Sequence, residues 1–198
     1  MHKTALILCG ALGREVKDLV QKHGWQVDLI GVSALDHLYP EKIAPDVEAR
    51  ILAIKEKYER VIVVFGDCGT MGKLDKVLAR HQIERVQGAH CYAMFSQGRF
   101  DTLLEEEPGT FFLTDFLVRA FHSTVIKGLG LDRYPELKGE YFRHYQRVVY
   151  LAQKPDAALM AKAQHIAEDF FALPLVVEET GYGWLEMELI ALLSELVF

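Results

Sequence analysis

The sequence lacks the long apolar runs and the basic excess that mark several classes of protein. No apolar run approaches the roughly 20 residues that a membrane-spanning helix needs, and the first residues turn charged too early for a signal peptide. The formal net charge of −6 argues against broad attraction to nucleic-acid phosphates or anionic lipid. We therefore expect a cytoplasmic protein with a small-molecule or protein partner, and neither a nucleic-acid nor a membrane partner.

Cysteine is scarce as well. The chain has three cysteines, an odd number with no CxxC pair. Such a set is unlike the disulfide framework of a secreted domain, so we expect free thiols, metal ligands or nucleophiles. The glycine-rich turns match neither the phosphate-loop motif nor the dinucleotide motif, and the chain contains no repeat or low-complexity tract.

What the chain does have is an alternation of short β-prone runs with helical patterns. The run Val61 to Phe65 is apolar throughout, which is typical of a central parallel strand covered on both faces. Strands are expected at residues 4–8, 27–32, 61–65, 84–86, 110–114, 148–152 and 174–178. A first helix is expected to follow Cys9-Gly10 and to run through Val20. Further helices are expected at residues 46–58, 70–81, 115–121, 156–171 and 184–196. The pattern predicts an α/β fold with a mainly parallel sheet flanked by helices, a Rossmann-like three-layer arrangement, in which residues 1–198 form a single α/β domain with room for two lobes.

The cysteines occupy equivalent places in this pattern. Cys9, Cys68 and Cys91 each follow a predicted strand directly or after a short turn. Ligand sites of parallel sheets lie at the carboxyl ends of the strands, so we expect the three thiols to meet there. Each thiol also precedes a predicted helix, whose amides and dipole favour the thiolate and lower its pKa from roughly 8.5. Three thiolates suit zinc with one open position, or an iron–sulfur cluster with one free iron.

Neighbouring residues are candidates for the same site. Asp67 or His90 could complete the ligand set or act in catalysis, with His90 as base for a cysteine nucleophile. The other histidines, His37 and His81 among them, are expected at the surface. The glycine-rich turns could instead cradle an anion on backbone amides, and the loop at 178–183 is expected to reach the same edge. The residues expected to bind a cofactor are Gly10, Gly66, Gly69, Thr70, Glu179 and Tyr182.

Blocks of sequence spread over almost the whole chain form a specific set: CGALGRE, VVFGDCGT, VQGAHCYAMF, PGTFFLTDF, GLDRYPELKGEYFRHYQRVVYLAQ and ETGYG. In these blocks the chain resembles the domain of unknown function 1638 family. The resemblance implies that Cys9, Cys68, His90 and Cys91 lie in the family's signature blocks, and it brings no established reaction. Members are often found alongside corrinoid-dependent methyl-transfer systems, which implies a partner protein from such a system.

These observations favour a metal-binding protein, and an enzyme, in which Cys9, Cys68 and Cys91 hold zinc or an iron–sulfur cluster with an open position for a small substrate. A zinc-thiolate could also activate a substrate thiol for methyl transfer. Two alternatives stay open. One is a non-catalytic module that holds a nucleotide or corrinoid fragment on its glycine turns, and the other is a thiol redox protein in which Cys68 pairs with Cys9 or Cys91.

Overall fold

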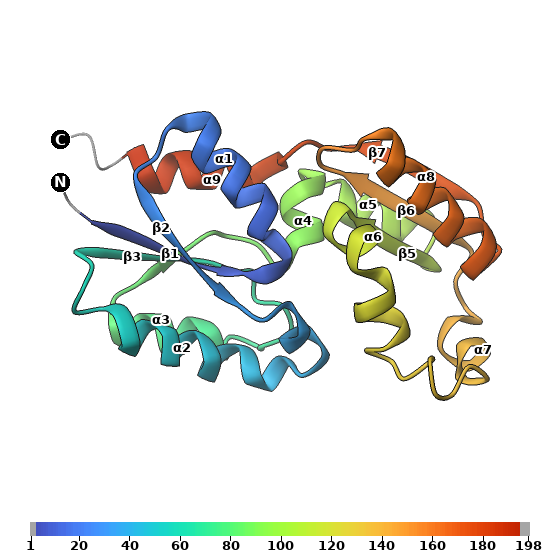
Figure 1. Cartoon of the computed structure of the whole chain (residues 1–198), viewed down its shortest axis with the longest axis horizontal. Coiled ribbons are helices and arrows are strands. Elements are labelled where there is room, and N and C mark those ends of the chain that lie inside the picture. Colours follow the sequence, from blue (N-terminus) through green and yellow to red (C-terminus); the bar gives the residue numbers. More distant parts are fainter. Residues whose placement is uncertain (1–2, 195–198) are drawn as a thin grey trace. The chain divides into compact units, whose positions relative to one another are not determined.

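The chain divides into two compact units. A computed structural model describes residues 3–194. Within this range, unit 1 comprises residues 3–94 and 184–194, and unit 2 comprises Phe95–Gly183. Unit 1 is therefore built from two separate stretches of chain, with unit 2 inserted between them (Figure 1).

Unit 1 contains a four-stranded parallel sheet in the order β2-β1-β3-β4. Its strands are β1 (Thr4–Cys9), β2 (Val27–Val32), β3 (Arg60–Val64) and β4 (Glu84–Arg85). Its longer helices are α1 (Gly13–His23), α2 (Ile43–Ile54), α3 (Lys73–His81) and α9 (Gly183–Ser194), and short 3₁₀ helices occupy Gly10–Leu12, Ala34–Leu38 and Pro40–Lys42. Helices α1 and α9 cover one face of the sheet, and α2 and α3 cover the other (Figure 1). This gives three layers.

The central strands of unit 1 are apolar throughout because helices cover both faces of the sheet. All six residues of β1 are buried, and Ile62, Val63 and Val64 of β3 are fully buried. The chain passes from β1 to β2 on one side and later places β3 on the other side of β1. The strand order therefore reverses between β1 and β3, which is where open α/β sheets place their ligands.

Unit 2 contains a three-stranded parallel sheet in the order β5-β6-β7. Its strands are β5 (Thr110–Thr114), β6 (Arg147–Ala152) and β7 (Leu175–Glu179). Its helices are α5 (Arg99–Glu106), α6 (Asp115–Phe121), α7 (Leu137–Phe142) and α8 (Ala157–His165), with π-helical turns at His122–Ile126 and Ile166–Phe171. The short helix α4 (Cys91–Ser96) spans the boundary between the units. Leu113, Val148 and Tyr150 of the sheet pack with residues of α6 and α8 in the core of unit 2.

The predicted fold class, α/β with mainly parallel strands flanked by helices, is confirmed. All seven expected strands are present, but they form two sheets. That residues 1–198 form a single domain stays a prediction. Helix α5 was not expected, and residues 195 and 196 of the last predicted helix lie outside the described range.

Two helix starts also differ from the prediction. Helix α3 begins at Lys73 rather than at Thr70, because Met71 and Gly72 adopt left-handed conformations that a helix cannot include. Helix α2 begins at Ile43, so Asp46 lies in its first turn and is not the N-cap residue. A carboxylate in the first turn still stabilises the helix through its interaction with the helix dipole.

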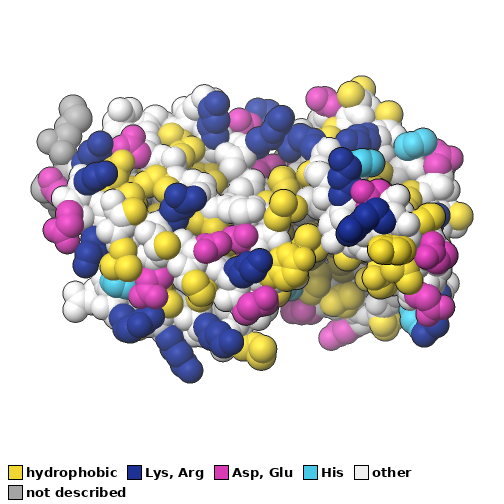
Figure 2. Space-filling model, turned by 60° about the horizontal axis from the view of Figure 1, so that its bottom comes forward, with side chains coloured by type: hydrophobic (Ala, Val, Ile, Leu, Met, Phe, Trp, Pro, Cys, Tyr) yellow, Lys and Arg dark blue, Asp and Glu magenta, His cyan; other side chains and the backbone are white. Residues whose placement is uncertain are grey.

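The described surface carries mixed charge. On the face shown in Figure 2, basic and acidic side chains are interspersed. None of the helices within residues 3–194 is both long enough and apolar enough to cross a membrane.

Candidate thiol site

Three strands of the unit 1 sheet lead into cysteines at their carboxyl ends. Cys9 is the last residue of β1, Cys68 lies in the turn after β3, and Cys91 begins α4 after the short strand β4. All three belong to unit 1. Two of them, Cys9 and Cys68, therefore flank the position where the strand order reverses. We call this carboxyl edge of the unit 1 sheet, with its three cysteines, the thiol edge.

The three thiols interact electrostatically. The charge of Cys68 contributes to the raised pKa of Cys9, and both Cys68 and Cys9 contribute to the raised pKa of Cys91. Such repulsion requires that the groups be neighbours. All three cysteines are free thiols. Within residues 3–194, however, no three His, Cys, Asp or Glu side chains are placed so that they could hold a metal ion together.

The expectation that helix dipoles lower the thiol pKa values is wrong. Burial raises the pKa of Cys9 to about 12 and that of Cys68 to about 11, and burial is also the main cause of the raised pKa of Cys91. Hydrogen bonds from backbone amides oppose these shifts but are weaker than the loss of hydration. The helix that begins at Cys91 spans only six residues, so its dipole is small, and three residues of 3₁₀ helix separate Cys9 from α1.

The turn after β3 is organised by Asp67. Its Oδ1 accepts hydrogen bonds from Thr70 Oγ1 at 2.6 Å and from the Gly72 amide at 2.9 Å, and its Oδ2 accepts one from the Met71 amide at 3.2 Å. The bond from Thr70 is the main cause of the lowered pKa of Asp67. The carboxylate stabilises a turn in which Cys68 and Met71 both have positive φ angles. Asp67 and Thr70 thus hold the position of Cys68.

Two glycines allow the loops of the thiol edge to pack closely. A Cβ atom at Gly66 would lie 2.8 Å from the His90 Cα, and one at Gly10 would lie 3.0 Å from the Val32 carbonyl oxygen. Next to Gly66, the Cys68 amide donates to the Ala89 carbonyl at 2.7 Å. The loops that carry Cys68 and Cys91 are therefore joined backbone to backbone. At Gly69, a Cβ atom would meet Pro40 at ordinary contact distance.

His37 was expected at the surface, yet the structure places it half-buried beside Cys9. Its Nε2 lies 3.9 Å from Cys9 Sγ, and its Nδ1 lies 3.0 Å from the Ala34 carbonyl oxygen. Its ring stacks against Phe65, with centroids 6.3 Å apart and planes 10° apart. Sequence reasoning missed this residue, although its position after β2 was a usable signal because β2 belongs to the same parallel sheet.

Asp36, next to His37, also approaches the thiol edge. Its side chain is 8% exposed, and its charge contributes to the raised pKa of Cys9. Its Oδ2 is buried without a hydrogen-bond partner. Burial is also the main cause of the raised pKa of Asp36 itself, followed by repulsion from Asp46. A side-chain hydrogen bond with Asp46 raises the pKa of Asp36 further, so the neutral form of this side chain is favoured.

His90 is engaged with its own helix. Its Nδ1 accepts a hydrogen bond from the Ala93 amide at 3.3 Å, and its ring meets the Tyr92 ring edge-on with centroids 5.6 Å apart. His90 thus contributes to the start of α4. Its role as a base or ligand stays a prediction.

Glu179 and Tyr182 do not belong to the edge of the sheet that carries the cysteines. Glu179 ends β7, and Tyr182 follows in the next turn, so both continue the carboxyl edge of the unit 2 sheet. The expectation that this loop reaches the same edge as the cysteines assumed a single sheet. The strands form two separate sheets instead.

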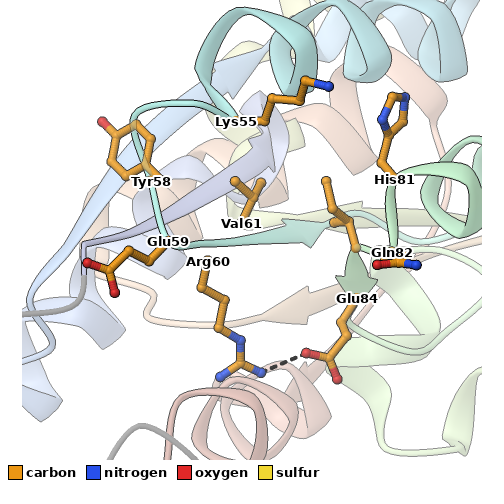
Figure 3. A pocket seen from close by; sticks show the side chains of 9 residues that line it. Lys55, Tyr58, Glu59, Arg60, Val61, His81, Gln82 and Glu84 are labelled. Carbon is orange, nitrogen blue, oxygen red and sulfur yellow. Dashed lines mark hydrogen bonds and ion pairs between the residues drawn. The ribbon is translucent and has the colours of Figure 1, made fainter.

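A hollow of about 210 Å³ lies at the opposite end of the unit 1 sheet, at the amino ends of β3 and β4 (Figure 3). Figure 3 shows Arg60 and Glu84 directed toward each other, with Arg60 Nη2 2.7 Å from Glu84 Oε2. His81 Nε2 lies 2.9 Å from Glu48 Oε1. Because these charged groups neutralise one another, the hollow offers less binding chemistry than the thiol edge.

Comparison with known proteins identifies a family but no activity. Searches of curated proteins and of solved structures gave no match. A family model described as "Protein of unknown function (DUF1638)" matches residues 33–189. This segment is most of the chain, and it contains Cys68, Cys91 and His37. The chain therefore belongs to the DUF1638 family.

Proposed function

We propose that the protein binds a soft metal centre, zinc or an iron–sulfur cluster, at the thiol edge and presents it to a small substrate. Cys9, Cys68 and Cys91 would supply the thiolates. One observation carries the proposal: each of the three cysteines ends or follows a strand of one parallel sheet, and two of them, Cys9 and Cys68, flank the point where its strand order reverses. Thiolate ligands select zinc and iron–sulfur clusters over harder cations.

Binding would require the thiols to close in on the metal and to lose their protons. As placed in residues 3–194, no three donors are at ligand spacing, and the pKa values of all three thiols are raised. A coordinating thiol is deprotonated by the cation itself. Zinc binding should therefore release about three protons per ion near neutral pH, and its affinity should rise with pH.

A nucleotide-binding module is less well supported by the glycine turns. In the turn after β3, the amides of Met71 and Gly72 already donate to the Asp67 carboxylate, and the amides of Asp67 and Cys68 donate to the carbonyls of Gly88 and Ala89. Phosphate cradles need amides that point at the ligand. Gly66 serves close loop packing rather than access for an anion.

A thiol redox protein is the second candidate, and the mutual proximity of the thiols favours it. Its weakness is the raised pKa of all three thiols, because the thiolate is the attacking species in disulfide exchange. In this alternative, Cys68 would form a disulfide with Cys9 or Cys91, and the high pKa values would make the reaction slow. Peptide mapping under non-reducing conditions detects such a bond directly.

The deciding experiment is purification without oxygen or chelator, followed by measurement of zinc, iron and acid-labile sulfide. We expect about one metal centre per chain, brown if it is an iron–sulfur cluster. Cys68→Ser and Cys91→Ser should each lose the metal, because an incomplete donor set remains. Met71→Leu is the matched control, since it removes an exposed sulfur from the same turn and should retain the metal.

The outcomes separate the candidates. Metal-free protein that still resists unfolding when a nucleotide is added would support the nucleotide module. Metal-free protein with a reversible disulfide at Cys68 would support the redox protein. Either result would replace the metal proposal.

A further inference from the structure

The strand β4 forms an open edge of the unit 1 sheet, because it pairs with β3 and is the last strand in the order β2-β1-β3-β4. The Val86 amide, directly after β4, donates to the Val63 carbonyl of β3 at 3.1 Å, so it faces the sheet. Backbone groups of successive residues in a strand point to alternate sides. The backbone groups of Arg85 and Gln87 therefore point away from β3. Such an outward row is a template for pairing with another strand.

A hollow of about 350 Å³ lies along this edge. It is lined by residues of α3 and α9, which cover opposite faces of the sheet, and by residues of and beside β4 (Figure 1). The apolar part of the lining includes Leu78 from α3, Ile83 before β4 and Leu192 from α9. Because both helix layers extend to this edge, the hollow lies where a fifth strand of the sheet would pair with β4.

A carboxylate already occupies part of this place. Glu188 Oε2 accepts a hydrogen bond from the Gln87 amide at 3.1 Å. It satisfies an outward amide of the edge as the carbonyl oxygen of a neighbouring strand would. The bond from Gln87 to a side chain of α9 also agrees with the outward direction of this amide.

The lining of the hollow has an excess of negative charge. It includes three carboxylates and one guanidinium, those of Asp75, Glu84, Glu188 and Arg85. Arg85 donates two hydrogen bonds to Asp75, from Nε at 2.6 Å and from Nη2 at 3.1 Å. Glu84 is paired with Arg60 at 2.7 Å. Among the described residues, Glu188 has no basic partner, so a lysine or arginine of a ligand would complement its charge.

We propose that the open edge of β4 binds an extended basic segment of a partner protein as an added strand. A carbonyl of the segment would accept from the Arg85 amide, and a basic side chain would pair with Glu188. Successive side chains of a strand point to opposite faces, so apolar residues of the segment would face Leu78 on the side of α3. The segment therefore alternates basic and apolar residues. This inference goes beyond the proposed function and does not depend on it, since it uses none of the cysteines.

A second copy of the chain fits this edge poorly. The chain has a net charge of −6, and pairing of two β4 edges would bring two Glu188 carboxylates into one interface. Like charges that face each other across an interface oppose association. A basic segment of another protein brings the complementary charge instead.

A labelled heptapeptide of alternating lysine and valine tests the inference in fluorescence-anisotropy titrations with the full chain. A peptide of alternating glutamate and valine should bind at least about tenfold more weakly. Glu188→Gln keeps an acceptor for the Gln87 amide but removes the charge, so it should weaken binding of the lysine peptide about threefold. Glu56→Gln is the matched control, because it makes the same change in net charge at an exposed residue outside the hollow, and it should bind like wild-type protein.

The backbone pairing has readouts of its own. Proline in place of the central valine of the peptide removes a strand donor and should weaken binding about tenfold. Binding of the parent peptide should also slow hydrogen exchange of the Arg85 amide, because this amide would gain an acceptor.

Three results would overturn the inference. They are no binding of the lysine peptide at millimolar concentration, equal losses of affinity in Glu188→Gln and Glu56→Gln, and unchanged exchange of the Arg85 amide when the peptide binds. Self-association of wild-type protein that excludes the peptide and slows Arg85 exchange would identify a second copy as the occupant, and would also overturn it. The metal proposal stands or falls separately from each of these results.

Discussion

The two parallel sheets end differently at their carboxyl edges. In unit 2, Asp115 follows β5 and is 1% exposed, with both carboxylate oxygens hydrogen-bonded. Its Oδ1 accepts from Tyr150 Oη at 2.6 Å and from the Gln153 amide at 3.1 Å, and its Oδ2 accepts from the Lys154 amide at 3.0 Å. In unit 1, three thiols occupy the corresponding edge, and Asp36 Oδ2 beside them has no partner.

The carboxyl edge of a parallel sheet can thus carry either polar groups that stabilise the fold or groups that are available to a ligand. A buried polar group whose hydrogen bonds are all made inside the protein ties strands together, and it has little capacity left for a ligand. Soft donors with weak hydrogen bonds, beside an oxygen without a partner, retain that capacity. The edge of unit 2 thus has its polar groups paired within the protein, and the contrast supports the proposal that the thiol edge is the functional one.

The largest expected effect comes from breaking the unit 2 edge. Asp115→Ala would leave Tyr150 Oη and the amides of Gln153 and Lys154 without their acceptor, so we expect the free energy of unfolding to fall by about 3–5 kcal/mol. Tyr150→Phe removes one of these bonds and should cost about 1 kcal/mol. Urea denaturation measures both. A loss of stability in Asp115→Ala no greater than that in Tyr150→Phe would contradict a structural role for this edge.

The next effect concerns the close packing of the thiol edge. A Cβ atom at Gly66 would meet the His90 backbone at 2.8 Å, so Gly66→Ala should lower the free energy of unfolding by about 1–3 kcal/mol. Gly31→Ala in β2 is the control, because a Cβ atom there would meet nothing within 4 Å. Equal thermal midpoints for the two variants would show that the loops at Gly66 and His90 can move apart to admit a methyl group at little cost.

The raised thiol pKa values predict slow alkylation of metal-free protein. At pH 8 the three thiols should react with iodoacetamide about tenfold or more slowly than in urea-unfolded protein, because little thiolate is present. Mass spectrometry across a pH series measures this for each cysteine. Cys68, with a pKa of about 11, should react before Cys9, with a pKa of about 12.

The same shifts predict a loss of stability at alkaline pH. The folded pKa values lie above the unfolded value of roughly 8.5, so the folded state holds more protons at high pH. Stability from the buried neutral thiols is fully present below the unfolded pKa and is lost as the pH rises through the folded values of about 11 and about 12. All the cysteines are in unit 1, so hydrogen exchange should detect this loss there. If the stability of Cys9→Ala depends on pH as strongly as that of wild-type protein, the alkaline loss of stability does not come from the buried Cys9 thiol.

The smallest effect concerns how the last strand residue caps the next helix at each edge. Thr114 accepts from the Leu117 amide at 3.3 Å, and Cys9 Sγ accepts from the Ala11 amide at 3.4 Å. Thr114→Ala should lower the free energy of unfolding by about 1 kcal/mol, and Thr114→Ser should restore most of it. If the Cys9 sulfur is a metal ligand, as proposed, Cys9→Ser should keep the helix cap but lose the metal. Retention of metal by Cys9→Ser would weaken the contrast between the edges.

The strands could be predicted because local sequence and burial agree in them. Val61 to Val64 is apolar throughout and forms a strand that helices cover on both sides. The helix cap at Asp156 was also predictable, and its side chain accepts from the Leu159 amide. Helix α5 was missed because it has only eight residues and begins directly after Gly98, which has a left-handed conformation. A helical period is hard to detect over so few residues.

The features of the site that were missed depend on contacts distant in sequence. Thr114 caps the helix that follows β5, so Asp115 can accept hydrogen bonds from Tyr150 in β6 and from Gln153 in the loop after it. The pKa of Cys9 follows from its burial in the folded protein, which the adjoining glycine does not indicate. His37 approaches Cys9 only because the segment after β2 folds back over the end of β1.

The split of unit 1 around unit 2 affects how the chain folds as it is synthesised. Helix α9 buries Leu185, Leu189 and Leu193, and its Glu186 bonds Lys22 Nζ at 2.7 Å. These residues are translated after all of unit 2. The first 94 residues therefore leave the ribosome with one sheet face incompletely covered, whereas unit 2 can finish folding earlier. In this protein the N-terminal stretch begins folding first and completes it last, because one face of the sheet that carries the three cysteines stays uncovered until α9 has been synthesised.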